Sequence, residues 1–320
     1  MKLGSTDVDV STFGFGGAGI GNLYNEVTDA DAQGALQACW DAGVRYFDTA
    51  PHYGLGLSER RLGRFLAGVP RDEYVISTKV GRVLEPFDGE GLDLDNGFAV
   101  PREFRRIMDY SRDGVLRSLE SSLDRLGVDR VDVLLIHDPD DHWEQASSEG
   151  FPALDELRSQ GVVGAIGVGM NQWQMPARFV RETSIDVVML AGRYTLLEQT
   201  AADEFLPLCQ ERGVSILEAG VFNSGLLARP EIPDNAKYNY ADAPAELIQK
   251  AQRIAAVCER HGVTLPQAAV QFVLRHPTTA SVVLGVKSAG QAVRNAELFA
   301  KPVPEGLWDD LRAEGLLDAG

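Results

Sequence analysis

Short apolar runs alternate along the chain with amphipathic stretches of roughly 10–18 residues, a pattern typical of repeated strand–helix units around a parallel sheet. Runs such as VDVLLIH and SVVLG are apolar for most of their length, as expected for strands buried on both faces. The pattern predicts an α/β fold, a (β/α)8 TIM barrel. Eight runs are expected to be its strands: Thr12–Gly16, Val44–Asp48, Glu73–Lys79, Val131–His137, Val162–Val168, Val187–Leu190, Ser215–Glu218 and Ser281–Leu284.

Amphipathic helices are expected between these strands, with Thr28 and Ser58 as candidate N-caps. The predicted helices include Ala30–Asp41, Ser58–Leu66, Ser111–Leu126, Gly150–Ser159, Thr200–Arg212 and Ala289–Phe299. Glycines that commonly end helices stand between a helix and the next strand at Gly43, Gly127, Gly161 and Gly213. No linker, repeat or low-complexity tract divides the sequence, so residues 1–320 are expected to form one barrel domain.

Three further segments lie outside the strand–helix alternation. Lys2–Val10 is expected to form a short hairpin that closes the barrel floor. Gly81–Pro101 is Gly- and Asp-rich and weakly periodic, so it is expected to be a loop inserted after the third strand. Pro230–Pro244 is expected to be a second long loop, after the seventh strand. In a barrel both loops lie on the C-terminal face, where active sites are built.

Composition narrows the range of partners. The formal net charge of −17 and the pI near 4.7 disfavour binding to nucleic acid or to an anionic membrane. No signal sequence and no apolar run long enough for a membrane helix is visible, so a cytoplasmic protein is expected. Cys39, Cys209 and Cys258 are far apart and form no CxxC motif, which predicts free thiols in a reducing compartment.

Four ionisable residues stand at or just beyond the ends of predicted strands. Asp48 ends the second strand, Tyr53 follows five residues later, Lys79 ends the third strand and His137 ends the fourth. Each has an ordinary alternative: a capping carboxylate, a half-buried aromatic, a lysine that extends to solvent, or a structural histidine. Because the C-terminal ends of barrel strands converge on one mouth, their joint placement favours an active site.

This group suits the interconversion of a carbonyl and an alcohol. A tyrosine hydroxyl is an effective general acid only if its pKa, about 10 when unperturbed, is lowered. A buried ammonium at Lys79 is expected to lower the pKa of Tyr53, and Asp48 to pair with Lys79. His137 is expected to hydrogen-bond the substrate oxygen.

The FDTAPHYG and LLIHDPD segments resemble the aldo-keto reductase family, and the likeness extends over nearly the whole chain. The family's catalytic Asp, Tyr, Lys and His fall in order on Asp48, Tyr53, Lys79 and His137. The resemblance implies NAD or NADP lying across the barrel mouth without a Rossmann domain. GFGGAGIGNLY, IGVGMNQW and RYTLLEQ are most similar to the bacterial L-fucose or D-threo-aldose 1-dehydrogenases and pyridoxal 4-dehydrogenase.

The glycine-rich segment GFGGAGIG contains a formal GxGxxG at Gly14, Gly16 and Gly19. A Rossmann fingerprint needs a helix immediately afterwards and an acidic residue about 20 positions on. Thr28 is the better helix start, and Asp48 lies 29 residues past Gly19, so a Rossmann fold is not expected. The small residues Gly16, Gly17 and Ala18 are instead expected to let the nicotinamide approach the pocket.

The segment GVKSAGQAVRNAE, after the eighth strand, is the better candidate for binding phosphate. It places Lys287 and Ser288 at a helix N-terminus, although an ordinary capped surface helix is the alternative. The resemblance puts Lys287, Gln291 and Asn295 at the adenosine, and Asn171 at the carboxamide. It further assigns the pyrophosphate to Phe222, Ser224 and Gly225.

The chain departs from the commoner family pattern at three cofactor positions. Ala219 stands where many members have a tyrosine stacked on the nicotinamide, and Ala191 where a glutamine binds its amide. Gln291 replaces an arginine common in NADP-specific members. These departures favour NAD, or use of both cofactors.

His52 and Trp143 are expected to contact substrate near the mouth. For Trp143, packing within its own loop is an equally good explanation. His137 and His142 in HDPDDH match no zinc-ligand spacing, so no metal site is predicted.

The leading functional hypothesis is an NAD(P)-dependent dehydrogenase of a small alcohol or hemiacetal, an aldose such as L-fucose, or pyridoxal. The alternatives are an NADPH-dependent carbonyl reductase and a non-catalytic nucleotide-binding barrel. A metal-dependent isomerase would need several carboxylates at strand ends, and only Asp48 and Glu218 are candidates.

Overall fold

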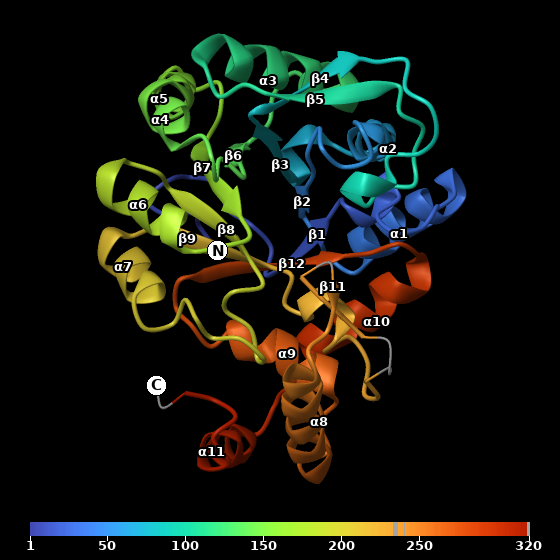
Figure 1. The fold of residues 1–320 in the computed structure, drawn as a ribbon, viewed down its shortest axis with the longest axis vertical. Helices are drawn as coiled ribbons and strands as arrows, with labels where there is room; N and C mark the ends of the chain where they lie inside the picture. The colour runs from blue at the N-terminus through green and yellow to red at the C-terminus, as the bar shows by residue number, and fades with distance from the viewer. Residues whose placement is uncertain (233–235, 240, 319–320) are drawn as a thin grey trace.

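Parallel strands close into the barrel that the sequence predicts (Figure 1). The computed structural model describes residues 1–232, 236–239 and 241–318, and within them eight strands follow one another around the barrel as β1-β12-β9-β8-β7-β6-β3-β2. Their bounds are β1 Phe13–Gly16, β2 Tyr46–Asp48, β3 Val75–Val80, β6 Val133–His137, β7 Ala165–Met170, β8 Val187–Ala191, β9 Ser215–Ala219 and β12 Thr279–Gly285. Each overlaps a predicted strand, so the (β/α)8 prediction is confirmed.

Helices form a ring outside the barrel (Figure 1). Those that overlap predictions are α1 Asp29–Asp41, α2 Leu57–Leu66, α3 Arg112–Leu126, α5 Phe151–Ser159, α7 Phe205–Arg212 and α10 Ala289–Ala300. The others are α4 Trp143–Gln145, α6 Gln174–Glu182, α8 Ala245–Arg260, α9 Leu265–Val273 and α11 Glu305–Ala313. The four predicted helix-ending glycines all have positive φ, as a glycine after a helix requires.

Thr28 caps α1 as predicted, since its side chain accepts a hydrogen bond from the Asp31 amide. The predicted cap at Ser58 is wrong, because Gly56 is the N-cap of α2. The Ser58 hydroxyl instead donates to the Gly17 carbonyl at 2.8 Å and ties the β1 loop to α2. A short-range pattern could not reveal this partner, which lies 41 residues away.

The insertion after β3 forms an arm rather than the predicted loop. Its strand β4, Arg82–Pro86, pairs antiparallel with β5, Phe104–Met108. The second strand lies beyond the predicted loop boundary, so local periodicity within Gly81–Pro101 could not show the pairing. Phe98 and Val100 of the arm pack with Leu55 from the β2–α2 connection, so the arm covers part of the barrel mouth.

The predicted loop Pro230–Pro244 includes residues 233–235 and 240, which lie outside the described residues. Its described part contains a short antiparallel pair, β10 Lys237–Tyr238 and β11 Ala241–Asp242.

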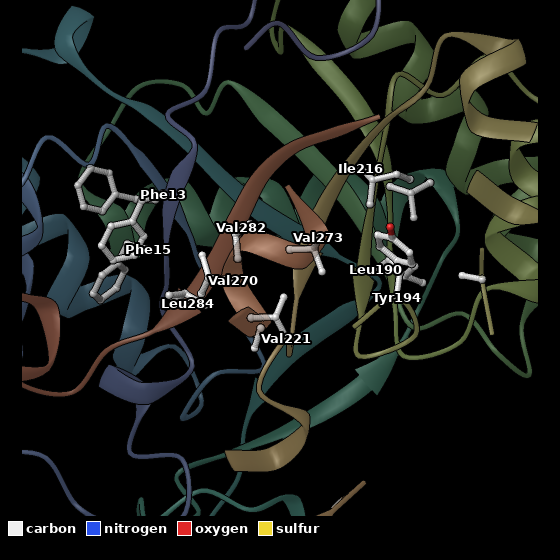
Figure 2. Packing of buried hydrophobic residues seen from close by; sticks show 14 of the residues in the cluster. Phe13, Phe15, Leu190, Tyr194, Ile216, Val221, Val270, Val273, Val282 and Leu284 are labelled. Atoms are coloured by element: carbon white, nitrogen blue, oxygen red, sulfur yellow. The ribbon is translucent and has the colours of Figure 1, made fainter. Parts of the chain in front are cut away.

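The predicted floor hairpin is confirmed by antiparallel pairing of Lys2 with Asp9. Leu3 and Val10 from this hairpin are buried with the inward-facing barrel residues, among them Tyr46 and Leu135. The outward-facing strand residues form a separate and larger core with the helices, part of which Figure 2 shows.

The state of the cysteines and the character of the helices can be compared with the expectations from composition. The three cysteines are buried free thiols, and burial raises the pKa of Cys39 to about 12. Within the described part of the chain, no helix has the length and apolar character needed to cross a membrane.

Glu218 is a buried acid in the outer core. It pairs in register with Leu190 and Val282, whose side chains face the helices, so Glu218 faces away from the barrel interior. Figure 2 shows Leu190, Ile216 and Tyr194 gathered in this region. Glu218 is 0% exposed, and neither carboxyl oxygen has a hydrogen-bond partner among the described residues. Burial raises its pKa well above the usual range, so the carboxyl is held uncharged.

We expect Glu218 to make stability fall as pH rises. In the folded chain Glu218 keeps a proton that the unfolded chain releases above its ordinary pKa of about 4.5. The neutral carboxyl therefore costs no stability below about pH 4.5. Above that pH the free energy of unfolding falls until the pH reaches the raised pKa of the folded state. Across this window the Glu218→Gln variant should gain about 1.4 kcal/mol per pH unit relative to wild type. Urea unfolding at several pH values measures the gap. The exposed-residue variant Glu211→Gln should show none, and a constant gap for Glu218→Gln would contradict a buried neutral acid.

Candidate active site

An ion pair inside the barrel holds the centre of the site. The Lys79 ammonium lies 2.9 and 2.7 Å from the two carboxylate oxygens of Asp48, and the two side chains are 1% and 2% exposed. The Ser77 hydroxyl donates to the same carboxylate at 2.7 Å. Burial alone would lower the pKa of Lys79, but Asp48 and Tyr53 outweigh it and raise the pKa. Lys79 is therefore a fixed cation.

Lys79 also donates to the hydroxyl oxygen of Tyr53 at 3.0 Å, so it joins Asp48 to Tyr53. The expected lowering of the tyrosine pKa is not found. Burial raises the pKa of Tyr53 to about 12, and Lys79 offsets only part of that effect. Tyr53 therefore stands in the site as a protonated phenol, hydrogen-bonded to a cation.

His137 completes the predicted group at the end of β6. Its ring centroid lies 5.9 Å from that of Tyr53, with the rings almost perpendicular at 89°. Burial lowers the pKa of His137 well below its usual range, and nearby cations, Arg82 first among them, lower it further, so the imidazole is neutral. The structure thus brings together all four residues that the sequence predicted.

The arm adds charged residues that the sequence analysis missed. Arg82 of β4 pairs with Asp138 at 2.7 Å. Arg106 of β5 pairs with Asp93 at 2.6 Å, and its Nε donates to Nδ1 of His52 at 2.6 Å. Asp138 follows His137 directly in LLIHDPD, and Arg82 follows Lys79 by three positions, so both could have been noticed. Nothing local marks Arg106, which reaches the site only through the pairing of β4 with β5.

Three ion pairs therefore surround the mouth, and their formal charges cancel: Lys79–Asp48, Arg82–Asp138 and Arg106–Asp93. Burial raises the pKa of Asp138 to about 6, against the opposing effect of Arg82. The site offers many hydrogen-bonding groups and little net charge, which suits a neutral polar ligand.

Trp143 is placed mainly by packing. Its ring contacts that of Phe179 at 4.7 Å between centroids, and the Arg178 guanidinium lies 3.8 Å from its centroid. These contacts account for the position of Trp143 and correspond to the loop-packing alternative.

The predicted adenosine-binding residues lie along one face at the start of α10. Lys287 precedes the helix, and Gln291 and Asn295 follow at intervals of four, so the three share one side. Ser288 caps α10, and the Gln291 side-chain oxygen accepts from the Lys287 amide at 2.9 Å. Asn295 is buried, and its Nδ2 lacks a hydrogen-bond partner among the described residues. An unused buried donor on this face fits a polar ligand such as a nucleoside.

A turn after β9 carries the predicted pyrophosphate residues. Asn223, Ser224 and Gly225 are successive residues with positive φ, which is costly for the two that are not glycine. Such backbone is concentrated at ligand-binding turns. Phe222 precedes this turn, and Asn171 lies exposed directly after β7.

Small residues line the mouth where larger ones would close it. Ala191 and Ala219 are paired neighbours at the ends of β8 and β9, and both are only partly buried. Gly16 ends β1 opposite Gly285; a Cβ added at Gly16 would lie 3.3 Å from the Gly285 amide nitrogen, whereas one added at Gly285 would meet no atom within 4 Å. Gly17 differs, since a Cβ there would lie 2.6 Å from the Ser58 hydroxyl, so protein packing already requires a glycine. Ala18 follows directly in this loop.

The formal GxGxxG does not open a helix. The short 3-10 turn Gly19–Gly21 follows it, and α1 begins only at Asp29, so the segment lacks the Rossmann arrangement, as expected.

The sequence profile of the Aldo/keto reductase family matches residues 12–313. The chain belongs to the aldo/keto reductase family. This aldo/keto reductase is an NAD(P)-dependent oxidoreductase, so the predictions of family, enzyme class and cofactor are confirmed.

The chain is 48% identical over 312 residues to D-threo-aldose 1-dehydrogenase from Pseudomonas sp, covering 96% of this chain and 95% of that one. It is 42% identical over 333 residues to pyridoxal 4-dehydrogenase from Microbacterium luteolum, covering 98% and 97%. Among solved structures, aldo-keto reductase AKR11C1 from Bacillus halodurans in its holo form superimposes with a TM-score of 0.79 at 24% identity, covering 100% of this chain and 96% of that one. This last likeness confirms the fold.

The geometry gives no support to the metal-dependent isomerase alternative. Asp48 faces the barrel interior whereas Glu218 faces the helices, so the two carboxylates do not meet. In the part of the chain that the structure describes, no three His, Cys, Asp or Glu side chains are grouped to hold a metal ion.

We expect the Lys79–Asp48 pair to be strongly coupled. Lys79→Met leaves the Asp48 carboxylate buried without its cation and should lower the free energy of unfolding by about 3–5 kcal/mol. The double variant Asp48→Asn, Lys79→Met removes both charges and should recover a large part of that loss. Urea unfolding of the two single variants and the double variant measures the coupling. Additive losses would show that the two charges are not a buried pair.

Proposed function

We propose that the enzyme oxidises the hemiacetal carbon of a neutral polyhydroxylated substrate, an aldose, with pyridoxal as the second candidate. The hydrogen bond from Lys79 to the hydroxyl of Tyr53 is the observation that carries this proposal. It joins a group that can exchange a proton with a substrate oxygen to a cation that stabilises the deprotonated phenol.

The charge of the site and the names of similar proteins both favour a neutral substrate. The three ion pairs nearest Tyr53 and His137 have formal charges that cancel, which suits a neutral substrate. Two similar proteins are named as dehydrogenases of neutral compounds, an aldose and pyridoxal.

In the proposed mechanism, Tyr53 and His137 bind the reacting oxygen. NAD or NADP supplies the hydride acceptor for oxidation and the hydride donor for reduction. In oxidation the deprotonated Tyr53 takes the proton of the substrate hydroxyl as the C–H bond breaks. Lys79 stabilises the phenolate that must exist before this step, and neutral His137 donates a hydrogen bond to the same oxygen.

Reduction of a carbonyl, the reverse reaction, is the alternative function. Its supporting observation is the raised pKa of Tyr53, about 12, because a protonated phenol is the form needed to donate to a forming alkoxide. Oxidation needs the other form, so its rate should rise with pH while that of reduction does not.

For the cofactor, we propose that Lys287, Gln291 and Asn295 hold the adenosine end. Phe222, Ser224 and Gly225 are proposed to surround the pyrophosphate. Asn171, with the small residues Gly16, Gly17 and Ala18, is proposed to bound the nicotinamide end near Asp48.

Tyr53→Phe should lower the rate of hydride transfer by about 10²-fold or more, since it removes the exchangeable proton. Cofactor affinity should change little, because the ring remains. The assay follows absorbance of the reduced nicotinamide with L-fucose, D-arabinose, L-galactose, pyridoxal and simple alcohols, each with NAD and NADP. Tyr74→Phe, which removes the hydroxyl of a buried tyrosine just before β3, at the other end of that strand from Lys79, is the matched control. Unchanged turnover in Tyr53→Phe would exclude Tyr53 as the proton donor and acceptor.

Lys287→Ala should weaken NADP binding roughly tenfold or more, and NAD binding less, if Lys287 meets the 2′-phosphate. At present its ammonium donates to the Leu23 carbonyl at 2.6 Å and is half-buried, so it is already held at this end of the mouth. Fluorescence titration with each cofactor measures the affinities, and Lys301→Ala at the exposed far end of α10 is the control. Equal losses for NAD and NADP would remove the proposed role.

A further inference from the structure

His52 lies beside the two residues proposed to bind the reacting oxygen. Its ring centroid is 5.6 Å from that of His137 and 6.1 Å from that of Tyr53. The ring is only partly buried, and the edge of Phe98 packs against it at 5.1 Å. His52 therefore forms one wall of the mouth, next to the reaction centre.

Arg106, on the β5 strand of the arm, hydrogen-bonds His52. Its Nε donates to His52 Nδ1 at 2.6 Å, and its Nη2 donates to the His52 carbonyl at 3.0 Å. Both its terminal nitrogens donate to Asp93, at 3.1 and 2.6 Å. The Arg106 and Asp93 side chains are 9% and 6% exposed, so this is a buried ion pair that holds the guanidinium in one orientation.

This contact determines where the imidazole proton lies. A guanidinium has only donors, so His52 Nδ1 must accept and carries no hydrogen. The neutral ring then has its hydrogen on Nε2, the nitrogen for which the structure shows no partner among the described residues. Protonation of Nδ1 would set one N–H against another and break the bond to Arg106.

The surrounding charges also oppose protonation. Arg82 of β4, Arg106 of β5, Lys79 of β3 and neutral His137 of β6 face His52. Burial, followed by Arg82, Arg106 and Lys79, lowers the pKa of His52 to about 2. Asp93 and Asp138 are already the ion-pair partners of Arg106 and Arg82, so neither is free to stabilise a charged imidazole at His52.

We propose that Arg106 is a positioning residue that holds His52 as a neutral Nε2–H donor, and that His52 gives this hydrogen bond to a substrate oxygen on the carbon next to the reacting one. The oxygen on the reacting carbon is already shared by Tyr53 and His137. Because Tyr53 and His137 are assigned to the reacting oxygen, His52, whose ring centroid lies 6.1 and 5.6 Å from theirs, is left for the neighbouring oxygen, which in an aldose is the 2-hydroxyl. The site thereby selects substrates with two neighbouring oxygen-bearing positions. This role in substrate choice rests on the proposed function, whereas the state of His52 does not.

Imidazole NMR of the ¹⁵N-histidine-labelled enzyme tests the state of His52 without any assay of activity. The chain has five histidines, and His52→Gln identifies the signal. We expect a fixed Nε2–H tautomer that does not titrate from about pH 8 to about pH 5. In Arg106→Met the Nε2–H tautomer should lose part of its preference, because the donor left near Nδ1 is Arg82 Nη1 at the longer distance of 3.4 Å. Arg105→Met, on the exposed side of the same strand, should match wild type. An Nδ1–H tautomer in wild type would overturn the proposal even if no variant folds.

Steady-state kinetics test the contact with substrate. D-arabinose and 2-deoxy-D-ribose differ in the hydroxyl next to the anomeric carbon. His52→Phe and Arg106→Met should raise KM for the hydroxylated sugar about three- to tenfold and change KM for the deoxy sugar little. Arg106→Lys keeps a cation and should restore part of the difference. Equal losses for both sugars would exclude the contact. Activity on neither sugar, with the tautomer as predicted, would contradict only the aldose function.

Discussion

The ion pair between Lys79 and Asp48 lies inside the barrel, where neither charge can be solvated. Ser77 donates to the Asp48 carboxylate, and the Lys79 ammonium also donates to the Thr49 carbonyl and to the Tyr53 hydroxyl. A buried charge without its partner costs several kcal/mol, so the lengths and register of β2 and β3 must keep these ends together. The position of Tyr53 depends on this pair, because the ammonium that neutralises Asp48 is the one that binds the phenol.

Burial acts on the site in two opposing ways. It makes the contact between Lys79 and Asp48 strong, and it raises the pKa of Tyr53 to about 12 despite the neighbouring ammonium. It also keeps both His52 and His137 neutral. The mouth consequently holds one tyrosine and two histidines in uncharged, hydrogen-bonding forms, framed by compensated ion pairs. Under the proposed function, these uncharged groups exchange a proton with a neutral substrate oxygen and donate hydrogen bonds to it.

The arm formed by β4 and β5 extends this framework beyond the barrel. Barrel strands present residues at their ends, whereas the arm brings Arg82 and Arg106 over the mouth from outside. Under the proposed function, the barrel supplies the reacting groups and the arm orients His52. Replacement of the arm could change the preferred substrate while leaving the Asp48, Tyr53, Lys79 and His137 group in place.

The sequence by itself determined the barrel, because buried parallel strands must be apolar along their length and surface helices must not. It also predicted that Asp48, Lys79 and His137 would meet, because strand ends converge in any such barrel, with Tyr53 just beyond the second strand. It could not determine the pairing of β4 with β5, because β5 lies beyond the weakly periodic segment Gly81–Pro101 that contains β4. Nor could it show that burial would outweigh Lys79 at Tyr53, or that Arg106 would meet His52 at a distance of 54 residues along the chain. Pattern and spacing record local geometry, whereas pKa values and tautomers depend on desolvation and on charges that only the folded chain brings together.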